Sequence, residues 1–112
     1  MGQHAQLSRR DAAVYVTLDS GRIERIQIGE RRVLVGSDPR NDICLANRNV
    51  QPRHASIYFA GGEHILSCVS DGSTLVNGSA VARSTPLENG DVIWIGGREL
   101  RFIRLQSIST TT

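Results

Sequence analysis

Glycine-containing turn pairs recur along the chain, and this pattern restricts the fold more than any other feature of the sequence. Such pairs supply the positive φ angles that tight hairpin turns require. No segment between them keeps the helical period of apolar residues over about eleven positions. The sequence therefore favours strands joined by tight turns. The pairs are Ser20-Gly21, Gly61-Gly62, Asp71-Gly72, Asn77-Gly78, Asn89-Gly90 and Gly96-Gly97.

Short runs rich in valine, isoleucine, leucine and aromatic residues lie between the turns, as is typical of strands. Some alternate cleanly, and in the run 55–59 the residues Ala55, Ile57 and Phe59 alternate with Ser56 and Tyr58. We expect strands over 13–18, 23–28, 33–35, 43–45, 55–59, 65–69, 74–76, 92–95 and 99–105. Short strands at this density predict an all-β sandwich or barrel. We expect one domain over 11–106, a flexible arm over 1–10 and a flexible tail over 107–112.

The charged residues exclude several classes of function. All 13 basic residues are arginine, which rules out a Schiff-base lysine and the lysine of a P-loop. A net charge of +2 is too small to indicate nucleic acid or an anionic membrane as a partner. A nucleic-acid-binding barrel is a weaker alternative, because few aromatic residues are available for base stacking. Its basic stretch would be Arg22, Arg25, Arg31 and Arg32.

No run approaches the roughly 18 apolar residues of a membrane span, and no signal peptide opens the chain. We therefore expect a cytoplasmic domain, alone or as a module of a larger protein. Cys44 and Cys68 form no metal-binding pattern. Alternation along their strands places Cys44 outward and Cys68 inward, and thiols on opposite faces cannot form a disulfide.

Serine, histidine and aspartate are present, but not in a catalytic arrangement. The chain has no nucleophile elbow and no His-Glu-x-x-His motif. His4, His54 and His64 do not have the spacing of metal ligands. We expect neither catalysis nor a metal or other cofactor.

Five short motifs follow one another between residues 35 and 102. They are Gly36-Ser37, Asp42-Ile43-Cys44-Leu45, Gln51-Pro52-Arg53-His54-Ala55, and the stretches 70–78 and 87–96. In this order they resemble the forkhead-associated (FHA) domain, whose pattern begins with Gly-Arg and continues through Asp-Ile-x-Leu and Ser-Arg-x-His-Ala. The resemblance implies a β-sandwich of about eleven strands. Its loops at one end bind a protein or peptide, usually through a phosphothreonine.

Other matching positions are expected to maintain the fold. Gly36 lets the backbone leave its strand where a Cβ would obstruct it. The resemblance implies that the His54 ring ties neighbouring loops together by hydrogen bonds, and that Thr74 belongs to the same structural motif. Asn77-Gly78 predicts a type I′ hairpin. Asp91 is expected to accept amide hydrogen bonds in the turn before the last hairpin.

The phosphate-binding positions depart from the family pattern. The family's arginine falls on Ser37, its phosphate-binding serine on Gln51, and its peptide-clamping asparagine on Gly72, with Asp71 directly before it. Hydrogen bonds to charged groups contribute about 1.5–3 kcal/mol each, so loss of the arginine and the serine removes roughly 3–5 kcal/mol of binding energy. The sequence thus predicts a non-catalytic protein-interaction module, for assembly or scaffolding, whose phosphate pocket is degenerate.

Two other binding surfaces are predicted. Arg40, Arg48 and Arg53 lie in or beside the same loops, and together they would rebuild a site for a phosphothreonine peptide in signalling. Trp94 alternates with core-facing isoleucines, which places it on the outer sheet face as a second interface, or packed against the amino-terminal arm. In a further alternative, hydroxyl groups of the tail 107–112 are phosphorylated, and the phosphorylated tail docks onto the loops of an FHA domain.

Overall fold

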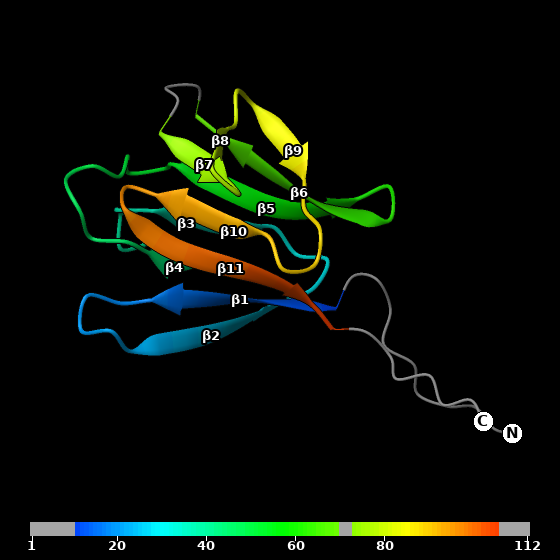
Figure 1. The fold of residues 1–112 in the computed structure, drawn as a ribbon, viewed down its shortest axis with the longest axis horizontal. Coiled ribbons are helices and arrows are strands. Elements are labelled where there is room, and N and C mark those ends of the chain that lie inside the picture. The colour runs from blue at the N-terminus through cyan, green and yellow to red at the C-terminus, as the bar shows by residue number, and fades with distance from the viewer. Residues whose placement is uncertain (1–10, 70–72, 106–112) are drawn as a thin grey trace, which may run out of the picture.

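The computed structural model describes residues 11–69 and 73–105, and within these ranges every regular element is a β-strand (Figure 1). No helix in these ranges is long and apolar enough to cross a membrane. The predicted arm, the predicted tail with its phosphoacceptors, and the site positions Asp71 and Gly72 lie outside the described residues.

The eleven strands of the described ranges form two sheets that pack face to face, which confirms the predicted all-β sandwich of about eleven strands (Figure 1). Within the described ranges, one sheet has six strands in the order β2-β1-β11-β10-β7-β8, and the other has five in the order β4-β3-β5-β6-β9. The six are β1 (Ala12–Thr17), β2 (Ile23–Ile28), β7 (Thr74–Val76), β8 (Ser79–Ala80), β10 (Val92–Ile95) and β11 (Arg98–Arg104). The five are β3 (Val33–Gly36), β4 (Ile43–Cys44), β5 (Ala55–Ala60), β6 (Glu63–Cys68) and β9 (Ser84–Pro86).

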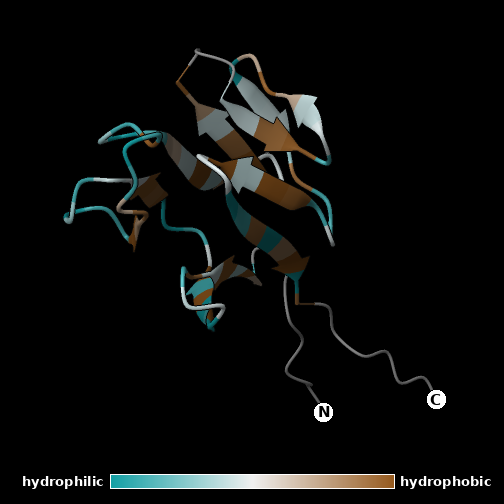
Figure 2. Ribbon diagram, turned by 60° about the vertical axis from the view of Figure 1, so that its left-hand side comes forward, coloured by the Kyte–Doolittle hydropathy of each residue, from teal (hydrophilic) through white to brown (hydrophobic). Residues whose placement is uncertain are grey.

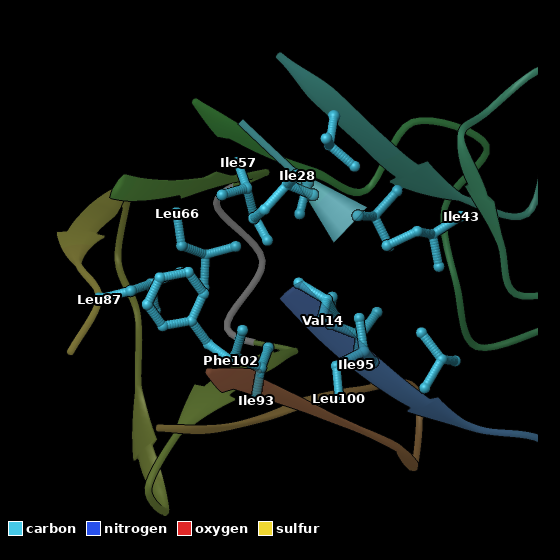
Figure 3. Packing of buried hydrophobic residues seen from close by; sticks show 14 of the residues in the cluster. Val14, Ile28, Ile43, Ile57, Leu66, Leu87, Ile93, Ile95, Leu100 and Phe102 are labelled. Atoms are coloured by element: carbon cyan, nitrogen blue, oxygen red, sulfur yellow. The ribbon is translucent and has the colours of Figure 1, made fainter. Parts of the chain in front are cut away.

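The core lies between the sheets and is made by the inward residues of both (Figure 3). Val14 pairs with Phe102 across β1 and β11, and Ile57 pairs with Leu66 across β5 and β6; all four are buried. Hydrophobic and hydrophilic residues alternate along the strands, whereas the loops are largely hydrophilic (Figure 2). Burial of one such aliphatic or aromatic side chain is worth about 1.5–3 kcal/mol.

Two of the strands, β8 and β9, have no counterpart among the runs predicted from the apolar pattern. Ser79 and Ala80 pair with β7 because Asn77 and Gly78 have φ angles of 52° and 87°, as a tight type I′ turn requires. β9 pairs along β6 although its own residues do not alternate in hydrophobicity. Tight-turn geometry and pairing to an existing strand edge, rather than burial, define both strands.

The two cysteines lie as the alternation predicted. Neither forms a disulfide; Cys44 is exposed, whereas Cys68 is half-buried and packs against the core. The Cys68 thiol also lies 3.5 Å from the carbonyl oxygen of Val81.

His64 on β6 is a buried titratable group with an incomplete set of hydrogen bonds. It is 1% exposed, and its ring centroid lies 5.0 Å from that of Phe59 and 5.3 Å from that of Phe102. Nε2 lies 3.1 Å from the Gly29 carbonyl oxygen, to which it donates, whereas Nδ1 has no partner among the described residues. Burial is the main cause that lowers the pKa of His64, since a charged ring would lose its hydration.

We expect His64 to make the domain less stable in mild acid. Because the folded state lowers the pKa of His64, the unfolded chain binds a proton first, and stability falls as the pH drops below about 6.5. One such proton gives a slope of at most about 1.4 kcal/mol per pH unit. Urea unfolding between pH 7.5 and 5 measures this slope. His64→Leu should flatten it, and an unchanged slope in this variant would assign the effect to another group.

Candidate functional site

Three segments meet at one end of the sandwich, and the backbone of His54 joins them. The amide of His54 donates to the carbonyl of Val35 on β3 at 2.9 Å, and its own carbonyl accepts the amide of Val69 after β6, also at 2.9 Å. His54 itself ends the loop between β4 and β5. The loop after β3, the loop before β5 and the segment after β6 are thereby held side by side.

The buried ring of His54 forms hydrogen bonds with the loop before β5 and with the residues at the start of β7. The Gln51 amide donates to Nδ1 at 3.0 Å, so Nδ1 carries no proton and Nε2 does. Nε2 lies 3.0 Å from the hydroxyl of Thr74, which is buried, and 3.0 Å from that of Ser73. The neutral ring therefore fixes the loop before β5 to the start of β7.

Gly36 allows the first two segments to approach closely. A Cβ on this residue would overlap the carbonyl oxygen of Pro52 and the side-chain amide of Asn41. The next residue, Ser37, donates its amide to the Gln51 carbonyl at 2.9 Å. The structure thus brings together Ser37 and Gln51, the two described positions at which the FHA pattern has its phosphate-binding arginine and serine.

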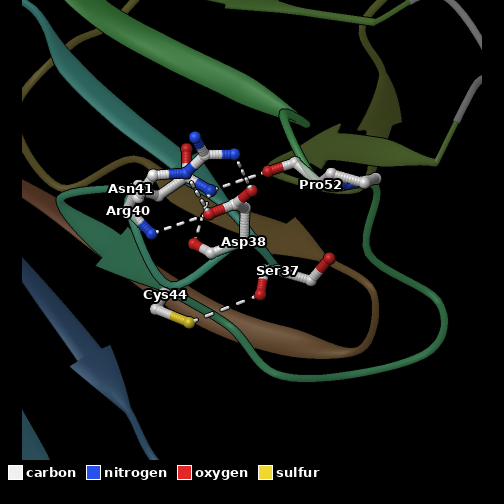
Figure 4. A network of polar contacts seen from close by, with 6 residues as sticks. All are labelled: Ser37, Asp38, Arg40, Asn41, Cys44 and Pro52. Carbon is white, nitrogen blue, oxygen red and sulfur yellow. Dashed lines mark hydrogen bonds and ion pairs between the residues drawn. The ribbon is translucent and has the colours of Figure 1, made fainter.

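A carboxylate lies directly beside Ser37. Asp38 accepts the guanidinium of Arg40 through both oxygens, at 3.1 Å from Nε and 2.8 Å from Nη2, and it also accepts the Arg40 amide at 2.8 Å (Figure 4). These hydrogen bonds, chiefly the one from the Arg40 side chain, hold the pKa of Asp38 well below its usual range. Asp38 is therefore ionised and Arg40 is already engaged.

Asn41 completes this network. Its side-chain amide donates to the carbonyl oxygens of Asp38 at 2.8 Å and of Pro52 at 2.7 Å, so one side chain ties the two loops together (Figure 4). The Cys44 thiol lies 3.6 Å from the Ser37 carbonyl oxygen. The side chains of Asp38, Arg40 and Asn41 in the loop after β3 are thus engaged within the protein.

Of the other two arginines of the predicted anion site, Arg53 lies near this pair and Arg48 lies apart from it. Arg53 is exposed, and its positive charge contributes to the lowered pKa of Asp38. Arg48 is exposed on a stretch where Asn47 donates to the Gly96 carbonyl at 3.1 Å. Neither Arg48 nor Arg53 forms an ion pair within the part of the chain that the structure describes. Arg40 and Arg53 therefore share one neighbourhood, and Arg48 belongs to a stretch anchored on the turn after β10.

The remaining residues predicted from the sequence lie in a turn and on the outer face of the six-stranded sheet. Asp91 accepts the amide of Glu88 at 2.8 Å and the side chain of Asn77 at 2.9 Å. Trp94 is 38% exposed on the outer face of the six-stranded sheet, where it pairs with Leu75. In the described ranges no three histidine, cysteine or acidic residues gather as metal ligands would.

Asp38, Asn41 and Ser73 also belong to this site, although they were not predicted from the sequence. The Asp38-Pro39-Arg40 segment carried a usable signal, since an aspartate before a proline favours a turn in which its carboxylate accepts the amide two residues later. The contacts of Asn41 with Pro52 and of Ser73 with His54 join distant parts of the chain, and no local pattern marks them.

Comparison with known proteins agrees with this geometry. A sequence profile of the FHA domain matches residues 33–96. The FHA domain of an Arabidopsis thaliana protein has a similar fold, with a TM-score of 0.80, 18% identity and 99% of each chain covered. The FhaA FHA domain, solved in complex with the intracellular domain of Rv3910, has a TM-score of 0.69 and 26% identity over 81% of this chain and 98% of that chain.

Mycobacterium tuberculosis EmbR, solved in complex with a low-affinity phosphopeptide, has a TM-score of 0.68 and 25% identity over 89% of this chain and 26% of that chain. No curated protein sequence matches the chain. The profile match covers more than half of the 112 residues, and the sandwich is similar to those of solved FHA domains. The chain belongs to the FHA domain family.

Proposed function

We propose that this FHA domain is a non-catalytic interaction module that binds a partner protein through its loop end and does not require phosphate. The partner class follows from the family, two of whose similar structures hold a protein domain or a phosphopeptide. The absence of a phosphate requirement is argued from this chain's own residues, Ser37, Asp38 and Gln51.

The observation that carries the proposal is the ion pair between Asp38 and Arg40. A phosphothreonine brings about −1.5 to −2 charges and needs a cation and neutral donors around it. Here the position of the family's arginine is a serine, the adjacent residue is an ionised carboxylate, and the nearest arginine is bound to that carboxylate by two hydrogen bonds. A phosphate would have to displace Asp38 from Arg40 while lying close to its negative charge.

The proposal predicts equal binding of phosphorylated and unphosphorylated peptides. Two peptide libraries with the same sequences, one carrying threonine and the other phosphothreonine at a fixed position, would be probed with the purified domain. For every retained sequence we expect the two dissociation constants to agree within about twofold. A preference of about tenfold or more for the phosphorylated form would overturn the proposal.

The alternative function is phosphothreonine recognition through Arg40, Arg48 and Arg53. It is favoured by the shared neighbourhood of Arg40 and Arg53 around Asp38. The substitutions Asp38→Asn and Arg53→Ala distinguish phosphothreonine recognition from binding that does not require phosphate. If these arginines read phosphate, Asp38→Asn should strengthen phosphopeptide binding by releasing Arg40, and Arg53→Ala should weaken it. If phosphate is not read, neither substitution should change the ratio between the two peptide forms.

A further inference from the structure

The outer face of the five-stranded sheet contains a shallow hollow of ≈ 260 Å³. Leu34, Ser56 and Ser67 line it in one row across β3, β5 and β6, because Leu34 pairs with Ser56 and Ser56 with Ser67. Arg53 and Val69 line its other end, next to the loops. The two serines are small, and the hollow lies over them.

The hollow has an apolar wall. Leu34 is 36% exposed on this face, where its side chain extends outward between the inward-facing Val33 and Val35. Val69 is half-buried at the opposite end. An apolar side chain seated between these residues would remove hydrocarbon from water on both sides of the contact.

The charges around the hollow are predominantly positive. Arg53 lines it, and the guanidinium of Arg32 donates to the Ser56 hydroxyl at 2.9 Å and lies 4.4 Å above the centre of the Tyr58 ring. Neither arginine has a carboxylate partner in the described ranges.

The nearby carboxylates are already neutralised by other groups. Asp42 accepts the Leu34 amide at 2.8 Å and the guanidinium of Arg31 at 3.3 Å, and Asp38 is paired with Arg40. Two guanidinium groups thus lie beside one apolar hollow, and neither forms an ion pair in the described ranges, although the charge of Arg53 also acts on Asp38.

We propose that this hollow, which adjoins the loop end and shares Arg53 and Val69 with it, is a second binding site for an extended acidic segment of a partner protein. One apolar side chain of the segment lies against Leu34, and carboxylates on either side of it pair with Arg53 and Arg32. Side chains on one face of an extended chain repeat about every 7 Å, so acidic residues two positions before and after the apolar one point the same way.

A titration of the ¹⁵N-labelled domain with a synthetic peptide tests this site. The peptide carries one leucine with aspartates at the second position on each side, glycine and serine elsewhere, and no threonine, so it does not probe the phosphate pocket. We expect saturable shifts of the amides of Leu34, Ser56, Ser67 and Val69. Replacing both aspartates by asparagine should weaken binding about tenfold or more.

Matched variants of the domain complete the test. Leu34→Glu adds a negative charge to the wall of the hollow and should weaken binding at least tenfold, whereas Ile23→Glu, at a residue 60% exposed on the other sheet, should leave it unchanged. Equal binding of the asparagine peptide, equal loss in both variants, or shifts confined to the loop around Ser37 would overturn the proposal. The proposed function at the loop end would be unaffected by any of these results.

Discussion

Replacement of His54 by alanine is expected to lower the free energy of unfolding by about 3–5 kcal/mol. The ring is fully buried, and its removal takes away the nitrogens that bond to the Gln51 amide and to the buried Thr74 hydroxyl. Each unsatisfied group costs about 1–3 kcal/mol, and the cavity adds to this. A domain of this size is typically stable by only about 5–15 kcal/mol, so the variant should be marginally folded.

Urea unfolding followed by tryptophan fluorescence measures this loss, since the chain has a single tryptophan. Arg48→Ala is the matched control from the same loop; the residue is exposed, and the change should stay within about 0.5 kcal/mol. Hydrogen exchange of the Gln51 amide should accelerate in His54→Ala more than exchange in the core strands. A loss below about 1 kcal/mol would show that the ring does not hold these loops together.

The core could be predicted from the sequence because apolar residues alternate along a strand with the same two-residue period with which its side chains face the core. Ile93 and Ile95 are both buried while Trp94 between them is exposed, as a strand with one face on the core requires. The same rule correctly placed Cys44 and Cys68. Strand ends were predicted less closely, since hydrogen bonding and not hydrophobicity decides them; β1 begins at Ala12 and β6 at Glu63.

The polar contacts of the candidate site could be predicted only in part. The residue types of a turn dipeptide indicate its backbone geometry, so the Asn77-Gly78 turn could be predicted from the local sequence. The ion pair of Asp38 with Arg40 is also local, but it competes with solvent and with other loop contacts, and residue types alone do not decide the outcome. Contacts such as Asn41 with Pro52 depend on how the whole sandwich brings two loops together.

The residues that hold the loops together, here called the loop frame, are different from the residues at the phosphate-binding positions. Gly36, His54 and Thr74 are buried and hold the loops by close approach and hydrogen bonds. Ser37 is half-buried and Gln51 is exposed, and a hydrogen bond between their backbones joins the two loops. The side chains at these two positions can therefore change while the frame remains, which makes recovery of a phosphate site by substitution a fair test.

The double variant Ser37→Arg with Gln51→Ser is expected to bind a phosphothreonine peptide about a hundredfold or more tightly than the present chain. The two side chains would supply roughly 3–5 kcal/mol through charge-assisted hydrogen bonds, and each 1.4 kcal/mol is tenfold in affinity. The Ser37 amide already lies 2.9 Å from the Gln51 carbonyl, so both new side chains start from adjacent backbone. Calorimetric titration with paired threonine and phosphothreonine peptides, in about 0.15 M salt, measures the gain.

Ala46→Arg is the matched control for this gain, because it adds the same charge at an exposed position of the neighbouring loop. Long-range attraction alone would raise phosphopeptide affinity similarly in both proteins and would weaken as salt rises. Ser37→Lys with Gln51→Ser adds the charge at the right place without the planar fork of arginine, and should recover less than the arginine variant. Should the arginine variant still treat both peptides alike, the lost selectivity would have to lie outside Ser37 and Gln51, and the neighbouring carboxylate of Asp38 would be the next group to remove.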